Sequence, residues 1–163
     1  MLQEQTGRLS HLAEILLDMT GVQTVERSER ISLAALTDEV FCDLASIAEQ
    51  KEVELIQQEG DCIITGSYLL LYRAVYNLVE NAIKYNHSGG KVTVNIHPSE
   101  EITDTSTSVN YVFLEVSDTG IGIPPEYQEK IFTPFFRVDK SRSRAMGGAG
   151  LGLALVSEIV RQH

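Results

Sequence analysis

The sequence contains few of the residues that cross-link a small protein. Its 163 residues include only two cysteines, Cys42 and Cys62, and no CxxC pair or nearby histidine accompanies either one. Neither a disulfide framework nor a zinc site is therefore expected. We expect both to be buried thiols in a reducing compartment. A chain of this length should be held together by a single hydrophobic core.

Long apolar runs and strong compositional bias are also absent. No segment approaches the roughly 20 apolar residues that cross a bilayer, and the start of the chain has no secretory signal pattern. The composition is 43% hydrophobic and 22% charged, with four prolines and 12 glycines, which excludes disordered, low-complexity and collagen-like chains. The sequence therefore predicts a folded, soluble domain.

Excess positive charge is missing as well. Lysines and arginines number 13 against 23 acidic residues, which gives a formal net charge of -10. Such a chain should repel a polyanion, so we expect no nucleic-acid partner. The exception is the segment RVDKSRSR at residues 137–144, with four positive residues and one negative. A small anion fits this local basic patch better than a long one.

The two common glycine-rich phosphate motifs are not present. Lys91 follows Gly90 but precedes Val92, so there is no GxxxxGK[ST], and Leu153 stands where GxGxxG needs its third glycine. A different glycine run nevertheless opens the last expected helix, at Gly147, Gly148, Gly150 and Gly152. Bare backbone N–H groups at the positive end of a helix dipole form an anion site.

The first residues follow a helical seam. Apolar residues occupy a and d positions of a heptad register at Leu2, Leu9, Leu12, Leu16 and Met19. The seam is too short to hold a coiled coil alone, so residues 1–21 need a partner helix, from elsewhere or from a second copy of the chain. The alternative is a helix that folds back on its own domain. Residues 22–30 are polar and are expected to be a linker.

From Ile31 onward, runs of alternating and helical periodicity predict a mixed α and β domain. We expect a short strand at Ile31 and an amphipathic helix after it. The further expected strands are 54–59, 62–65, 91–97 and 111–117, of which the last two should form a hairpin. The further expected helices are 67–85 and the segment that begins at Gly148.

The helix expected at 67–85 carries a polar stripe beside its apolar face. Asn77, Asn81 and Lys84 lie within roughly 60 degrees of one another on a helical wheel. Amide oxygens suit a hard cation that keeps waters and phosphate oxygens in its shell, as Mg²⁺ does, and Lys84 could then contact phosphate. Taken alone, such a stripe is also compatible with solvated surface. The neighbouring apolar face is expected to contain Leu71, Ala74, Val75, Leu78 and Ala82.

Two further segments could contact a nucleotide. In VSDTGIGIPP a strand ends at Asp118, whose carboxylate could accept a hydrogen bond from an exocyclic amine, beside glycines that permit close backbone approach. An ordinary turn is an equal alternative. The long irregular stretch 123–147 is typical of a lid, with phenylalanines as anchors and cations facing phosphate. These are Phe132, Phe135, Phe136, Arg137, Lys140, Arg142 and Arg144; a solvated basic loop is the alternative.

Taken together and in order, these segments resemble one family. NLVENAIKY resembles the N box, DTGIG the G1 box, FTPFF the F box and GAGLGL the G2 box of histidine kinase catalytic domains. Those domains share a wider ATPase superfamily with gyrase, the Hsp90 chaperones and MutL. The resemblance covers about residues 31–163. Residues 1–21 resemble the end of the dimerisation and histidine-phosphotransfer domain.

The resemblance implies an α+β fold of the GHKL (Bergerat) type, a two-layer α/β sandwich with helices on one face of a mixed sheet and a flexible ATP lid. It implies Asn81 as the principal Mg²⁺ ligand, with Asn77 assisting, and Arg137 as the first lid residue on phosphate. The rest of the implied ATP site is Lys84 at the phosphates, Tyr85 beside adenine, Asp118 on its amino group, and Gly120, Gly122, Ile123, Arg142, Gly148, Gly150, Leu151 and Gly152.

Two departures from related enzymes shape the expected activity. The superfamily's hydrolases carry a glutamate where Asn77 stands, and an amide cannot activate water, so a kinase is favoured. The family's acceptor motif, similar to HELRTP, is missing, and His11, His87, His97 and His163 are in other contexts. The chain alone is therefore not expected to autophosphorylate. An anti-sigma-factor-type serine kinase and a non-enzymatic, nucleotide-gated interaction module are the alternatives.

The resemblance also implies partners and a location. The expected partners are the protein's own dimerisation and phosphoacceptor domain, in a homodimer, and a response regulator. A cytoplasmic location is expected, with contact to a membrane only through upstream segments. The family's domain usually continues into a hairpin after its last helix, and that hairpin is missing from this sequence. An exposed sheet edge is the expected consequence.

Overall fold

The computed structural model describes residues 25–99, 111–138 and 150–163. The expected heptad helix at 1–21 lies outside the described residues. So do the expected lid residues Lys140, Arg142 and Arg144, and Gly147 and Gly148 of the glycine run. In the part that is described, every helix is too short or too polar to cross a membrane.

The strands of the described residues form two sheets. Strands β1 (Glu29–Ser32) and β3 (Ile63–Gly66) pair antiparallel. The other sheet is mixed and has the order β2-β4-β5, in which β2 (Glu54–Gln57) runs parallel to β4 (Lys91–Pro98). Strand β5 (Val112–Asp118) pairs antiparallel with β4, which confirms the expected hairpin partners. Within the described residues β5 lies at one edge of this sheet.

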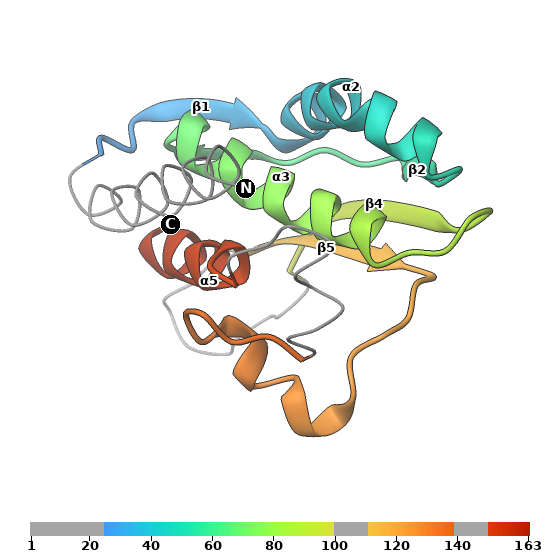
Figure 1. Cartoon of the computed structure of the whole chain (residues 1–163). Helices are drawn as coiled ribbons and strands as arrows, with labels where there is room; N and C mark the ends of the chain where they lie inside the picture. Colours follow the sequence, from blue (N-terminus) through green and yellow to red (C-terminus); the bar gives the residue numbers. More distant parts are fainter. Residues whose placement is uncertain (1–24, 100–110, 139–149) are drawn as a thin grey trace, which may run out of the picture.

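In the described part of the chain, three α-helices pack with the three-stranded sheet around the core. They are α2 (Leu33–Gln50), α3 (Tyr68–Lys84) and α5 (Gly152–Gln162), and two short 3-10 helices, η1 (Pro125–Tyr127) and η2 (Lys130–Phe132), interrupt the segment after β5. Helix α3 is central, with α2 on one side and α5 on the other (Figure 1). In β4, Val92, Val94 and Ile96 are buried beneath the helices. The expected α+β architecture is confirmed.

Side-chain caps fix where α2 and α3 begin. Ser32 accepts a hydrogen bond from the N–H of Ala35 at 3.1 Å, and Asp61 accepts one from Ala34 at 3.0 Å. These bonds satisfy N–H groups that have no partner within the helix. The N–H of Ala34, and then the hydroxyl of Ser32, lower the pKa of Asp61. Ser67 caps α3 in the same way.

Hydrogen bonds between side chains join α3 to its neighbours. The hydroxyls of Tyr68 and Tyr72 donate to Glu39 and Asp43 of α2. The bond to Glu39 is the main cause that raises the pKa of Tyr68 to about 12. At the other side, His163 at the end of α5 accepts from the backbone N–H of Ser67 at 3.0 Å. The start of α3 is therefore held from both flanks.

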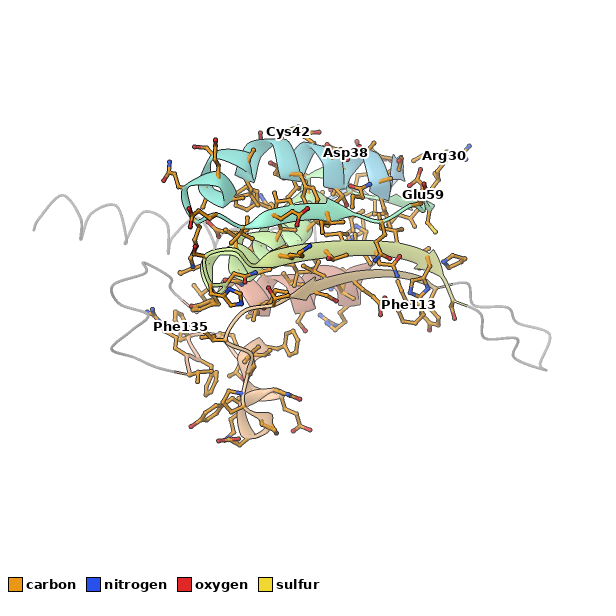
Figure 2. The ribbon with its side chains drawn as sticks, turned by 90° about the vertical axis from the view of Figure 1, so that its right-hand side faces the viewer. Arg30, Asp38, Cys42, Glu59, Phe113 and Phe135 are labelled. Carbon is orange, nitrogen blue, oxygen red and sulfur yellow. The ribbon has the colours of Figure 1, made fainter. Side chains whose placement is uncertain are left out.

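Two sequence expectations about burial are wrong in part. The core face of α3 is centred on Val79 and Ile83, which are fully buried, whereas Leu78 is only partly buried at its margin. The expected burial of both cysteines is contradicted, because Cys42 is exposed and Cys62 is partly exposed. Cys42 lies on the outer side of α2 (Figure 2). An error of one residue in helical phase, about 100 degrees, is enough to exchange a core position for a surface one.

Adjacent leucines at the start of α3 provide a test of this packing. Leu70 is 3% exposed and Leu69 is 53% exposed. We expect Leu70→Ala to lower the free energy of unfolding by about 2–5 kcal/mol, because it removes apolar contacts and leaves a cavity. Leu69→Ala should change it by within about 0.5 kcal/mol. Urea denaturation of the two variants measures the difference, and equal losses would contradict the assigned helical phase.

Candidate functional site

The polar stripe on α3 faces the start of α5. Asn77 donates from Nδ2 to the carbonyl of Arg73 at 2.8 Å. A Cβ added to Gly152 would lie only 2.5 Å from the side-chain oxygen of Asn77, Oδ1, which is too close for any side chain. Glycine at 152 therefore lets α5 approach α3 this closely. One turn further along α3, Asn81 is partly buried, and no hydrogen bond within the described residues engages its side chain.

The end of α3 carries Lys84, whose charge is influenced by that of Arg137. Burial is the main cause that lowers the pKa of Lys84; the carboxylate of Glu80 opposes this shift, and the charge of Arg137 adds to it. Lys84 Nζ also lies 5.5 Å from the ring centroid of Tyr85. Arg137 Nη2 is buried and has no hydrogen-bond partner among the described residues. A buried guanidinium nitrogen without an acceptor is suited to an anionic ligand.

The loop after β5 packs against the C-terminal end of α3. Ile121 donates from its backbone N–H to the carbonyl of Tyr85 at 3.1 Å. A Cβ on Gly120 would collide with the same carbonyl. Asp118 Oδ1 accepts the N–H of Gly120 at 2.8 Å, while the residue as a whole is exposed. One carboxylate oxygen thus orients the side chain and the other is available.

A second set of contacts behind this loop was not expected from the sequence. Asn86 donates from Nδ2 to the carbonyl of Lys91 at 2.9 Å, and Thr119 Oγ1 donates to Asn86 Oδ1 at 3.2 Å. Thr119 Oγ1 also accepts the N–H of Lys91 at 2.9 Å. We call these side chains, with the backbone of Lys91, the Asn86–Thr119 network. Its only sequence signal is position, since Asn86 follows Tyr85 and Thr119 follows Asp118.

The expected lid is described only up to Val138. After Gly120 the chain leaves the sheet and loops away from it before it returns toward α5 (Figure 1). Phe132 and Phe135 do not anchor it in the core, because they are 45% and 58% exposed. Figure 2 shows Phe135 outside the stacked layers. Phe136 contacts Tyr127, with ring centroids 5.8 Å apart, but Tyr127 belongs to the same stretch, so this contact holds the segment to itself and not to the core.

Backbone contacts connect the described end of the lid to the glycine run. The N–H of Phe135 donates to the carbonyl of Gly150 at 2.8 Å. Gly150 has a φ of 74°, and a Cβ there would lie 2.8 Å from the carbonyl oxygen of Phe136. Only glycine meets both demands at this position. The F box and the G2 box are therefore in direct contact before α5 begins.

The remaining expected site residues are less closely grouped. Gly122 has open space around it, and Ile123 is 42% exposed on the looping segment. Leu151 is fully buried, so in this conformation it packs the start of α5 and presents no surface to a ligand. Arg142 and Gly148 lie outside the described residues.

The donor atoms present determine which ligands the site can hold. Within the described ranges no cluster of three or more histidine, cysteine, aspartate or glutamate side chains could hold a metal ion by itself. The unengaged amide of Asn81, three residues from Lys84 on the same helix, instead fits a hard metal ion whose other ligands are phosphate oxygens and water. A divalent cation complexed with a polyphosphate therefore fits these residues better than a free metal ion.

Comparison with known proteins agrees with this geometry. The family model described as "Histidine kinase-, DNA gyrase B-, and HSP90-like ATPase" matches residues 66–163. The sensor histidine kinase RppB of Synechocystis is 36% identical over 167 residues, covering 99% of this chain and 35% of RppB. WalK of Bacillus subtilis is 31% identical over 166 residues, covering 99% of this chain and 26% of WalK.

A solved structure agrees at the level of the fold. The histidine kinase AdeS of Acinetobacter baumannii has a TM-score of 0.68 and 25% sequence identity, over 99% of this chain and 71% of that one. The chain spans 35% and 26% of the two curated relatives' lengths. The chain thus belongs to the family of histidine kinase-, DNA gyrase B- and HSP90-like ATPases, as an ATP-binding catalytic domain of the sensor histidine kinase type.

Proposed function

We propose that this chain binds Mg-ATP beside the C-terminal half of α3 and passes the γ-phosphate to a histidine outside the catalytic domain. The observation that carries the proposal is Arg137 Nη2, which is buried beside Lys84 without an acceptor among the described residues. The charge of Arg137 acts unfavourably on the Lys84 ammonium, and an anion between the two would offset this repulsion. A phosphate group supplies both the missing acceptor and the missing charge.

Asn81 is the proposed principal ligand for Mg²⁺, with Asn77 assisting. Support comes from the unengaged side chain of Asn81 and from Asn77, whose amide nitrogen is already bound to the Arg73 carbonyl. That bond turns Asn77 Oδ1 toward the start of α5. When bound, Mg²⁺ neutralises the phosphates during transfer. The protein's part is to hold oxygen ligands in a fixed position on a rigid helix.

Adenine is proposed to lie beside Tyr85 with its amino group on Asp118. The bond from the Gly120 N–H fixes one oxygen of Asp118 and leaves the other to accept from an amine. Lys84 and Arg137 are proposed at the phosphates. The proposed lid and glycine positions that complete the site are Gly120, Gly122, Ile123, Arg142, Gly148, Gly150, Leu151 and Gly152, with Leu151 acting through packing.

Phosphate transfer is favoured over hydrolysis by the chemistry of position 77. A water molecule attacking the γ-phosphate needs a base, and the amide of Asn77 cannot accept a proton at neutral pH. Two of the histidines, His163 and His97, are engaged by other contacts. Both ring nitrogens of His163 are hydrogen-bonded, to Ser67 and to Ile159, and His97 faces Glu115. An acceptor histidine on another segment is therefore part of the proposal.

The wider setting of the domain follows from the same proposal. Residues 31–163 are proposed as the catalytic domain, and residues 1–21 as the end of a dimerisation and phosphoacceptor helix. The expected linker 22–30 is shortened to 22–28, because Glu29 and Arg30 belong to β1 and pair with β3. In the intact protein, we propose that this domain is part of a homodimer and lies on the cytoplasmic side of a membrane. The homodimer would pass phosphate to a response regulator. These assignments are supported by the sensor histidine kinases that the whole chain resembles.

Calorimetric titration of ATP into this chain tests the nucleotide site. We expect binding on the order of -7 to -8 kcal/mol with Mg²⁺, and weaker binding when Mg²⁺ is removed or Asn81→Ala is introduced. Asn95→Ala is the matched control, because Asn95 lies on the sheet face away from the helices and should leave ATP affinity unchanged. A folded chain that binds no ATP would refute the proposal.

Arg137→Ala tests which cation contacts the phosphates. We expect ATP affinity to fall roughly ten- to a hundredfold, since a hydrogen bond to a charged group is worth about 1.5–3 kcal/mol. Adenosine, which has no phosphate, should bind both forms equally. Lys130→Ala, a lysine on the exposed η2 of the same segment, is the control and should have little effect. Equal losses for ATP and adenosine would show that Arg137 acts on folding instead.

A further inference from the structure

The Asn86–Thr119 network joins three segments that are distant in sequence. Asn86 follows the C-terminal end of α3, Lys91 begins β4, and Thr119 lies in the loop after β5. Thr119 Oγ1 makes two bonds, donating to Asn86 Oδ1 at 3.2 Å and accepting the Lys91 N–H at 2.9 Å. The Thr119 N–H also donates to the Lys91 carbonyl at 3.1 Å. The hydroxyl is thus used as both donor and acceptor.

The network is closely packed around Asn86. Asn86 is 6% exposed, and its Oδ1 also accepts the N–H of His87 at 3.0 Å. A Cβ on Gly90 would collide with this oxygen and would lie 2.9 Å from Thr119 Oγ1. Glycine at 90 therefore makes room for the contact between the two side chains. Because the bonds have defined directions, they fix both the position and the orientation of the Thr119 backbone.

Each side chain of the network is the chain neighbour of a residue proposed to contact adenine. Asn86 follows Tyr85, and Thr119 follows Asp118. We propose that Thr119, held by Asn86, is a positioning residue that keeps the Asp118 carboxylate directed at the 6-amino group of adenine, and so sets selectivity for that base. This inference rests on the proposed function, because it assumes that adenine lies against Asp118.

The effect should be specific to the amino group. Thr119 and Asn86 bond to each other and to the backbone, and they contact the base only through their neighbours in the chain. If the Thr119 hydroxyl is removed, the Lys91 N–H and Asn86 Oδ1 each lose a partner, and the loop can shift the Asp118 carboxylate. Contacts of the phosphates with Lys84 and Arg137 lie on other segments and should persist.

The test compares two nucleotides in the full chain with Mg²⁺. ATP is compared with purine riboside triphosphate, which has hydrogen in place of the 6-amino group. In Thr119→Val we expect ATP affinity to fall on the order of tenfold and affinity for the analogue to change less than about twofold. Thr119→Ser keeps the hydroxyl and should keep the preference for ATP. Thr93→Val, on the outer face of β4, is the control and should alter neither affinity.

A double variant separates positioning from general stability. If Thr119 acts through Asp118, Thr119→Val combined with Asp118→Asn should favour ATP no less than Asp118→Asn alone. A Thr119→Val chain that loses affinity equally for both nucleotides, or that keeps its preference for ATP, would overturn the inference while leaving the proposed function intact. An unmodified, folded chain that bound neither nucleotide would overturn both.

Discussion

The C-terminal end of α3 is the point on which the arrangement of the site depends. The last carbonyls of a helix have no partner inside the helix and must be satisfied from outside. Here Lys51 donates to the carbonyl of Lys84, and Ile121 donates to that of Tyr85. The first bond ties α3 to the end of α2, and the second ties it to the loop that follows β5. The loop with Asp118 is therefore located by a backbone requirement of the helix that carries Asn81.

The same end of α3 concentrates positive charge. Lys51 and Arg137 both contribute to the lowered pKa of Lys84, after burial itself. Holding Arg137 Nη2 buried without an acceptor is unfavourable for the protein alone. Such an arrangement persists only where the surrounding fold holds the groups in place. Lys84 is held because α3 packs against both α2 and α5. A phosphate ligand would supply the acceptor that Arg137 Nη2 lacks. Binding would therefore remove the free-energy cost of the unpaired nitrogen, which favours the nucleotide complex.

Much of the fold could be predicted from local patterns because local rules act there. Ser67 marks the start of α3 as a cap, and alternation in β4 and β5 gives their faces correctly. The site residues on α3 were also recognisable, since their helical spacing does not depend on the rest of the chain. The beginning of α5 was less predictable: helix geometry begins at Gly152, whereas the glycine run suggested Gly148.

The contacts that could not be predicted join segments far apart in sequence. Nothing local to Lys51 indicates that it caps α3, and nothing in KYN or DTG indicates that Asn86 bonds Thr119. The first contact depends on how α2 packs against α3, and the second on the register between β4 and β5. The exposure of Phe132 was missed for a related reason, because an apolar run after Pro125 does not reveal whether a core lies within its reach.

A crystal structure of this chain with Mg²⁺ and the ATP analogue AMPPNP tests the central claim most directly. The account predicts a phosphate oxygen within about 3 Å of Arg137 Nη2, with the adenine amino group on Asp118. A nucleotide bound elsewhere would contradict it. Such a place is the shallow hollow between α2 and β2, which is lined by residues that include Asp38, Phe41 and Leu55.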